Sequence, residues 1–192
     1  MRQLTYLVAT SLDGRIAAPD GDVTAFPTDG DHVDALVREH PDTIPAFAHA
    51  ALGAQATGAE FDTVLMGWST YAAGFAVTRD PYPHARQVVF SRRRAPDDAA
   101  PGVEVTAEDP VAVVRRLKQE PGTGIWLCGG GRLAGALADE VDRLVLKINP
   151  VLLSDGVPLL AGPATTRRFV HETTTTHDSG VVVATYRRDR VG

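Results

Sequence analysis

The amino-acid sequence predicts an α/β fold with a mixed, mostly parallel sheet, and three observations lead to this prediction. Short β-rich runs alternate with helix-like runs up to about residue 150, which is typical of strand-helix-strand units. Beyond that point, two β-rich segments flank Asp178-Ser179-Gly180 and predict an antiparallel C-terminal hairpin. The chain has 192 residues, 44% of them hydrophobic, which is enough to bury a full core. We therefore expect a single domain over residues 1–192.

The first half of the chain predicts two strands with helical segments between and after them. The run 4–10 is rich in Leu, Val and Thr and predicts a strand that ends at Ser-Leu-Asp-Gly. Apolar residues three and four apart predict a helix over 31–39, and an alanine-rich run predicts another over 45–56. The apolar run 61–67 predicts a buried strand, and a short helix follows it.

The second half of the chain predicts two longer helices and most of the remaining strands. Asp109 suits the N-cap and Pro110 the first position of an amphipathic helix in the segment 109–120. Another helix is predicted over 132–140. The strands predicted in this half are 86–91, 103–106, 124–128, 141–153, 168–176 and 181–189.

Charge and composition exclude several classes of function. The formal net charge of -5 gives no general electrostatic reason to bind nucleic acid or an anionic membrane. The N-terminus lacks the long apolar region of a signal peptide, and no run approaches the roughly 18 apolar residues of a membrane span, so we expect a cytoplasmic protein. The single cysteine, Cys128, excludes an intramolecular disulfide and a zinc deaminase motif. No histidine pair has helical metal-ligand spacing, so we expect no metal site.

Three consecutive glycines stand between a predicted strand and a predicted helix. Gly129, Gly131 and Ala134 fit the pattern G-x-G-x-x-G/A, in which the backbone approaches a pyrophosphate at a helix N-terminus. A Rossmann unit also needs an acidic residue after the next strand, and the run 144–150 has none, so that layout fits poorly. Tight packing at the turn is the alternative to ligand approach.

Two other predicted strands end in residues suited to phosphate. Gly67 is followed by the hydroxyls of Ser69 and Thr70, where a helix begins. The third strand ends in Ser91 and the three arginines 92–94, which form either a solvated surface turn or a phosphate subsite. Three such strand ends suggest an extended nucleotide laid across the edge of the sheet.

Five motifs follow one another through almost the whole chain: SLDGRIA, VLMGWSTY, VVFSRR, IWLCGGGRLAGAL and VDRLVLKINPVLLSDGVPLL. In this order the chain resembles the dihydrofolate reductase-like superfamily, particularly bacterial reductases similar to the C-terminal domain of the riboflavin-pathway bifunctional deaminase-reductase. The resemblance implies a three-layer α/β/α fold with about eight strands, and NADPH as hydride donor. It also implies a small pterin- or pyrimidine-like substrate, and a homodimer built through the C-terminal strands.

The resemblance also assigns cofactor-binding positions. The nicotinamide end would be lined by Ala9, Gly14 and Ile16, and the pyrophosphate would be held by Gly67, Trp68, Ser69 and Thr70. The 2'-phosphate would face Ser91, Arg92 and Arg93. The central phosphates and the nicotinamide ribose would be wrapped by Gly129, Gly130, Gly131, Arg132 and Leu133. Relatives usually carry arginine where this chain has Trp68. That indole would either stack on the adenine or pack internally, and the arginines 92–94 could supply the missing charge.

The chain matches fewer of the family's substrate-binding motifs than of its cofactor-binding motifs. Folate-reducing members use a carboxylate on the helix after the first loop, and this chain lacks their Leu-Pro-Trp lead-in. Asp13 is the expected catalytic contact, with Asp22, Phe26 and Tyr71 as wall residues. We expect an NADPH-dependent reductase that transfers a hydride to a small heteroaromatic substrate. The alternative is a catalytically silent nucleotide-binding module, or a structural dimer, that retains the cofactor groove.

Overall fold

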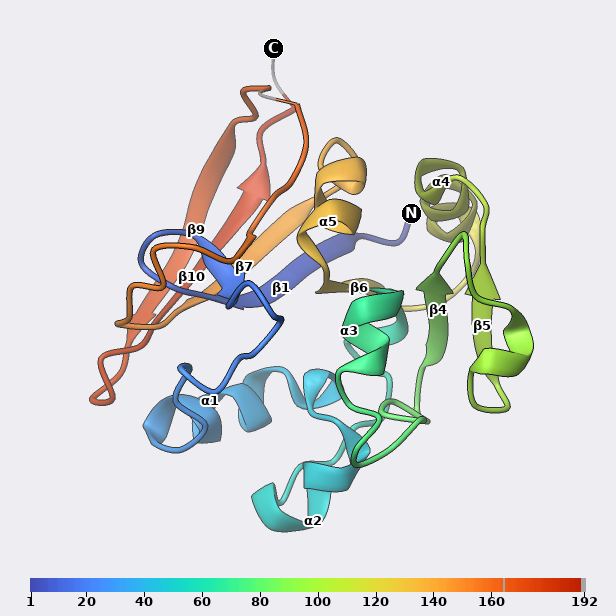
Figure 1. Ribbon diagram of the computed structural model, residues 1–192. Helices are drawn as coiled ribbons and strands as arrows, with labels where there is room; N and C mark the ends of the chain where they lie inside the picture. The colour runs from blue at the N-terminus through green and yellow to red at the C-terminus, as the bar shows by residue number, and fades with distance from the viewer. Residues whose placement is uncertain (164, 191–192) are drawn as a thin grey trace.

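A central eight-stranded sheet organises the computed structural model, which describes residues 1–163 and 165–190 (Figure 1). The strand order is β5-β4-β3-β6-β1-β7-β10-β9. Neighbours from β5 to β7 pair in parallel, whereas β10 runs antiparallel to both β7 and β9. The strands are β1 (Leu4–Thr10), β3 (Phe61–Gly67), β4 (Arg86–Phe90), β5 (Val103–Thr106), β6 (Gly124–Gly129), β7 (Arg143–Ile148), β9 (Phe169–Thr176) and β10 (Val182–Arg188). The predicted mixed sheet with an antiparallel C-terminal hairpin is confirmed.

Helices cover both faces of this sheet. Helices α4 (Pro110–Gln119) and α5 (Gly131–Leu137) pack on one face, and α1 (Asp31–Glu39) and α3 (Trp68–Ala72) contribute to the core on the other. Figure 1 shows α1 and the short α2 (His49–Leu52) on the side of the molecule away from α4 and α5. This three-layer arrangement was expected from the family resemblance.

The central strand β1 shows how the sequence builds the two cores. Leu4, Tyr6 and Val8 point to the face covered by α4 and α5, and Leu7 points to the opposite face. Because parallel strands with helices on both faces are buried on both sides, the run is mostly apolar, and its two threonines, Thr5 and Thr10, are buried as well. Each fully buried aliphatic side chain contributes about 1.5–3 kcal/mol of transfer free energy.

Two predicted elements are shorter in the structure, and one pair of strands was not predicted. The predicted helix 45–56 is wrong in length, because it forms only a 3-10 turn at Ala46–Ala48 and α2, which ends where Gly53 adopts a positive φ of 65°. The predicted strand 141–153 shortens to β7, and Pro150, which lacks an N–H to donate, follows soon after. A small antiparallel pair, β2 (Arg15–Ala17) with β8 (Val157–Pro158), was not predicted.

The buried carboxylate of Asp42 anchors the segment that leads into β3. Asp42 lies in a 3-10 turn at Pro41–Thr43 and is 2% exposed. Its two oxygens accept hydrogen bonds of 2.8–3.0 Å from four backbone N–H groups, those of Thr57, Gly58, Glu60 and Phe61. Burial raises the pKa of this carboxyl, but the four hydrogen bonds outweigh it and hold the pKa below its usual range.

A second carboxylate ties α1 to the turn between β9 and β10. The Asp31 side chain accepts hydrogen bonds from the backbone N–H groups of Asp178 and Ser179, at 2.8 and 3.1 Å. The buried His32 ring contacts the Ser179 hydroxyl through Nδ1 at 2.9 Å and the Pro27 carbonyl through Nε2 at 3.2 Å. These contacts hold α1 and the loop before it beside the sheet.

The edge strand β9 is mostly exposed, and assembly through the C-terminal strands stays a prediction. None of the helices in residues 1–163 and 165–190 has the length and apolarity needed to cross a membrane.

Replacing Asp42 with Asn turns one acceptor oxygen into an N–H donor that faces other donors. We expect Asp42→Asn to lower the free energy of unfolding at pH 7 by about 2–3 kcal/mol, the range of charge-assisted hydrogen bonds. Because the folded pKa is lowered, this stabilisation is present at neutral pH and is lost as the pH falls below about 4. Urea unfolding at pH 7 and pH 3 measures it, with the exposed Asp34→Asn as control. An equal stability gap at both pH values contradicts this account.

Candidate functional site

The carboxyl ends of the parallel strands bring the predicted nucleotide motifs to one edge of the sheet. Strands β3 and β6 are neighbours, and Met66 pairs with Gly129 in their register. Helix α3 begins directly after β3, and α5 begins two residues after β6. A Cβ added at Gly130 would lie 3.4 Å from the Thr70 hydroxyl oxygen, so the two turns are in contact. Ligands of open α/β sheets bind at this edge.

A cleft of about 440 Å³ opens at this edge, on the sheet face that α1 and α3 cover. Its wall is largely apolar and comes from β1, β6, the loop before α1, and the start of α3. Seven residues predicted from sequence line it: Ala9, Ile16, Phe26, Ser69, Thr70, Gly129 and Gly130. The volume falls in the range of pockets that hold a small molecule.

The glycine run serves two purposes. Gly129 and Gly130 have φ values of 153° and 94°, which side chains rarely adopt, and both line the cleft. Gly131 faces away from the cleft, and a Cβ there would overlap the carbonyl oxygen of Pro158 in β8. A Cβ added at Gly135, one turn later in α5, would likewise overlap the carbonyl oxygen of Ala161. Close packing of the 158–161 segment therefore explains part of the motif, and the cleft borders the rest.

Gly67 differs from these glycines because its backbone is ordinary. Its φ is -75° and its ψ is 157°, values open to any residue. A Cβ added there would meet nothing within 4 Å. No packing or conformational requirement therefore accounts for glycine at this strand end.

Trp68 is half-buried and packs against the core. Its ring lies 5.5 Å from the Tyr71 ring and 5.9 Å from the Phe75 ring, centroid to centroid, in edge-on contacts. The Arg94 guanidinium carbon lies 5.2 Å from the Trp68 ring centroid, within cation–π range. The indole thus links the turn after β4 to the turn after β3.

The other two arginines of the run after β4 are exposed. The Ser91 hydroxyl accepts hydrogen bonds from the backbone N–H groups of Arg93 and Arg94, at 3.2 and 3.1 Å, and shapes the turn. Arg92 and Arg93 extend from this turn into solvent. On α5, Arg132 is also exposed, whereas Leu133 is buried in the core at 7% exposure.

The residues predicted for the substrate side lie apart, except for Phe26 in the cleft wall. The Asp13 carboxylate accepts hydrogen bonds from the Ser11 hydroxyl at 2.6 Å and from the backbone N–H groups of Leu153 and Ser154. The Ser11 bond is the main cause of its lowered pKa. Asp13 therefore joins two surface turns, as does Gly14, whose carbonyl accepts from Leu159 at 2.9 Å. A substrate contact by Asp13 stays a prediction.

Asp22 and Tyr71 have internal partners as well. The exposed Asp22 carboxylate accepts hydrogen bonds from the Thr24 backbone and hydroxyl. The Tyr71 hydroxyl donates to the Arg79 carbonyl at 2.6 Å and accepts from the Ala100 N–H at 3.0 Å. Their roles as wall residues are likewise untested.

Sequence reasoning missed Lys147 and the position of Cys128 in the cleft wall. Burial lowers the pKa of the Lys147 ammonium. Burial raises the pKa of the Cys128 thiol to about 12, although a hydrogen bond with Tyr82 acts in the opposite direction. The signal for Lys147 was a single lysine within the apolar run of β7, which only the sheet register places beside Ala9.

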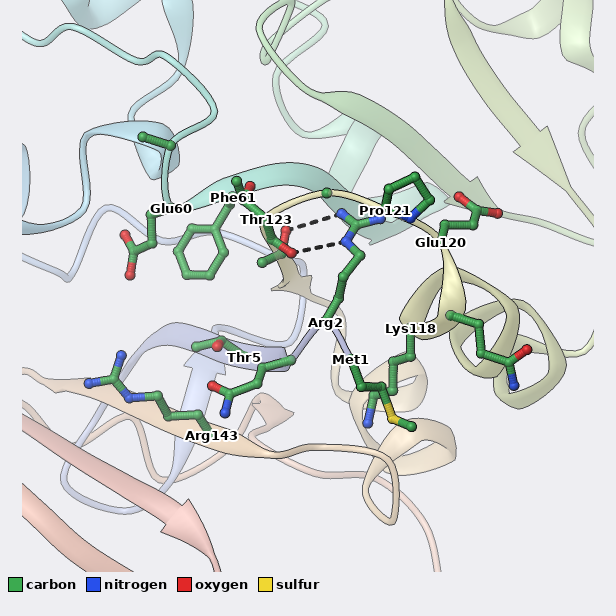
Figure 2. Close-up of a pocket in the computed structure, with 15 residues that line it drawn as sticks. Met1, Arg2, Thr5, Glu60, Phe61, Lys118, Glu120, Pro121, Thr123 and Arg143 are labelled. Carbon is green, nitrogen blue, oxygen red and sulfur yellow. Dashed lines mark hydrogen bonds between the residues drawn. The ribbon is translucent and has the colours of Figure 1, made fainter.

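A larger hollow of about 1060 Å³ lies at the opposite edge, by the amino ends of the strands (Figure 2). Its charged side chains are paired within the protein. The Arg2 guanidinium pairs with Asp62 and donates to the Thr123 carbonyl at 2.9 Å, and the Lys118 ammonium lies 2.7 Å from Asp142. Glu120 and Arg143 form ion pairs with Arg86 and Glu172, and the Glu60 carboxylate contacts the His40 ring at 2.9 Å. The charged side chains of this hollow therefore already have partners within the protein.

Comparisons with known proteins agree with this geometry. The family model described as the RibD C-terminal domain matches residues 2–183. YwjB of Bacillus subtilis, described as uncharacterized, is 29% identical over 161 residues, covering 82% of each chain. A Shewanella sp. PV-4 protein assigned to riboflavin biosynthesis has a similar structure, with TM-score 0.71, 21% identity, and coverage of 99% of this chain and 100% of its own. Dihydrofolate reductase from Enterococcus faecalis aligns with TM-score 0.64 and 17% identity, over 97% and 96%. The dihydrofolate reductase-like fold is confirmed.

The raised pKa of Cys128 predicts an unreactive thiol. With the pKa near 12 instead of the usual 9, roughly a thousandth of the ordinary thiolate fraction is present at pH 8. We expect alkylation of Cys128 by iodoacetamide to be at least about a hundredfold slower in the folded protein than in urea. Mass spectrometry of timed samples measures both rates. Equal rates would contradict a raised pKa for this thiol.

Proposed function

The chain belongs to the RibD C-terminal domain family, and on this premise we propose that it is an NADPH-dependent reductase of a small pyrimidine- or pterin-like substrate. The observation that carries this proposal is the contact between the turns after β3 and β6. One turn begins at Gly67 and the other carries Gly129 and Gly130, both follow adjacent parallel strands, and both border the apolar cleft.

The residues at this edge fit a dinucleotide. The space beside Gly67 is open, the Ser69 and Thr70 hydroxyls line the cleft, and Gly130 brings bare backbone to its wall. These groups would hold the pyrophosphate through backbone N–H groups and hydroxyls. The exposed Arg92 and Arg93 would bind the 2'-phosphate, since guanidinium groups pair well with phosphate.

The chain itself contributes binding, orientation and exclusion of water. NADPH, when bound, supplies the hydride. The apolar side chains of Ile16, Phe26, Leu36 and Trp126 enclose a space suited to a flat ring. Holding that ring against the nicotinamide end at Ala9 would lower the entropic cost of the reaction.

A catalytically silent nucleotide-binding protein is the second candidate, and one observation favours it. Within the described residues, the wall of the cleft carries no carboxylate. A folate-type reductase would need one to orient its pteridine. Binding of NADPH without its oxidation, across a panel of dihydropterins and pyrimidines, would support this second function.

Gly67→Ala separates a ligand requirement from a folding requirement. The φ of -75° accepts alanine, so we expect the apo protein to gain about 0.4–1 kcal/mol in stability from reduced freedom of the unfolded chain. If the pyrophosphate lies beside Gly67, the methyl group lowers NADPH affinity at least about tenfold. In thermal melts, a hundredfold excess of NADPH over its Kd stabilises the parent by about 2.7 kcal/mol.

Gly74→Ala is the matched control for this variant. Its Cβ would meet only the Thr78 carbonyl, at an ordinary 3.8 Å, and Gly74 does not line the cleft. We expect NADPH to bind this control as it binds the parent. Unchanged NADPH affinity in Gly67→Ala would show that the nucleotide does not bind beside this turn. A parent whose melting temperature does not change with NADPH would refute the proposed function.

The arginine pair predicts the cofactor preference. We expect Arg92→Ala with Arg93→Ala to weaken NADPH by about 1.5–3 kcal/mol, the range of charge-assisted hydrogen bonds, and to leave NADH nearly unchanged. Titration calorimetry with both nucleotides measures the difference. The exposed Arg116→Ala on α4 controls for the loss of surface charge. Equal losses for NADPH and NADH would exclude a 2'-phosphate contact.

A further inference from the structure

Lys147 is the one charged side chain among the described residues that line the cleft. It lies on β7, where it pairs with Ala9 of β1 and Val183 of β10. Two residues earlier, Val145 packs in the core with Leu7 and Trp126, on the face that borders the cleft. Alternate residues of a strand share a face, so Lys147 extends toward the cleft and lies beside the nicotinamide end assigned to Ala9.

No side chain of the described residues compensates this ammonium. The Lys147 ammonium makes no hydrogen bond or ion pair within the described chain, although the Lys147 backbone carbonyl accepts from the Asn149 side chain, and its neighbours in the cleft wall are neutral. The chain's other lysine, Lys118, provides a contrast. Lys118 is 5% exposed, its ammonium lies 2.7 Å from Asp142, and it donates to the Glu140 carbonyl at 2.6 Å. The fold thus pairs one sheltered lysine and leaves the other facing a cavity.

An unpaired ammonium in an apolar wall is costly for folding. Desolvation without a partner destabilises the charged form, which is the cause of the lowered pKa of Lys147. Nothing in the packing of β7 requires a cation, because methionine has a similar length and no charge to desolvate. The position therefore makes physical sense if a ligand supplies the missing negative charge.

We propose that Lys147 binds an anionic group carried directly on the ring of the substrate, such as a ring carboxylate. This inference rests on the proposed function in one respect, that the cleft is the substrate site. The group must lie close to the ring because Lys147 is flanked by the apolar cleft wall, where Leu36 and Trp126 also lie. In this environment an ammonium discriminates strongly, since a neutral ligand would cover it and leave it unpaired.

The test compares two probes of nearly identical shape, naphthalene-2-carboxylate and naphthalene-2-carboxamide. Their binding is measured at pH 7 by titration calorimetry, with and without NADPH. We expect the parent to bind the carboxylate at least about tenfold more tightly than the carboxamide. Lys147→Met should abolish this preference by weakening the carboxylate at least about tenfold while changing the carboxamide by less than about twofold. Lys147→Arg, which keeps the charge, should retain most of the preference.

Stability provides a second readout that a structural lysine would not give. Lys147→Met should raise the Tm of the apo protein, because it removes an uncompensated charge from an apolar wall. Arg116→Met, on the exposed surface of α4, controls for the loss of one positive charge. We expect it to leave both the Tm and the probe preference close to those of the parent.

Three results would overturn the inference. One is a parent that does not prefer the carboxylate, including a parent that binds neither probe. Another is equal weakening of both probes in Lys147→Met, which would assign Lys147 to packing. The third is competition between the carboxylate and NADPH, which would place Lys147 in the cofactor site. A parent that prefers the carboxylate but gives no shift with NADPH would refute the proposed reductase and leave the anion site standing.

Discussion

The parallel pairing of β3, β6 and β1 is the constraint on which the candidate site depends. These strands are buried on both faces, so their sequences are mostly apolar and their register is closely specified. That register brings the turn after Gly67 into contact with the turn after Gly129 and places Ala9 on the neighbouring strand. The polar groups that we assign to ligand binding lie just beyond the ends of β3, β6 and the neighbouring β4, or on β7.

Charged side chains are paired at the amino ends of the strands, whereas several at the carboxyl ends have no ionic partner among the described residues. At the amino ends, Arg2 and Lys118 are neutralised by Asp62 and Asp142, which closes the N-terminal segment onto the body of the protein. At the carboxyl ends, Lys147 faces an apolar cleft without a partner, and Arg92 and Arg93 extend into solvent. Charges that the fold leaves uncompensated are available to a ligand, and those of Lys147, Arg92 and Arg93 lie near the edge where α/β sheets bind their ligands.

The sequence predicted the order of helices and strands along the chain and part of the site, and its errors have physical causes. The buried strands were predictable because their apolar runs end at glycine, serine or proline, whereas the helix 45–56 was overestimated because alanine content does not show where Gly53 ends it. Gly131 was read as a ligand contact, but its lack of a side chain also admits Pro158, a long-range contact invisible in the sequence. Lys147 was overlooked because only the pairing with Ala9 distinguishes it from an ordinary strand lysine.

The measurement that tests this account most directly is a crystal structure of the protein grown with saturating NADPH. The account predicts nucleotide density at the carboxyl edge, with the pyrophosphate between the turn that begins at Gly67 and the turn that begins at Gly129. The nicotinamide ring should then lie in the apolar cleft, within reach of Ala9 and with Lys147 still free to meet a substrate. Nucleotide bound in the hollow beside Arg2 and Lys118, or a cleft filled by the nucleotide's own phosphates on Lys147, would contradict it.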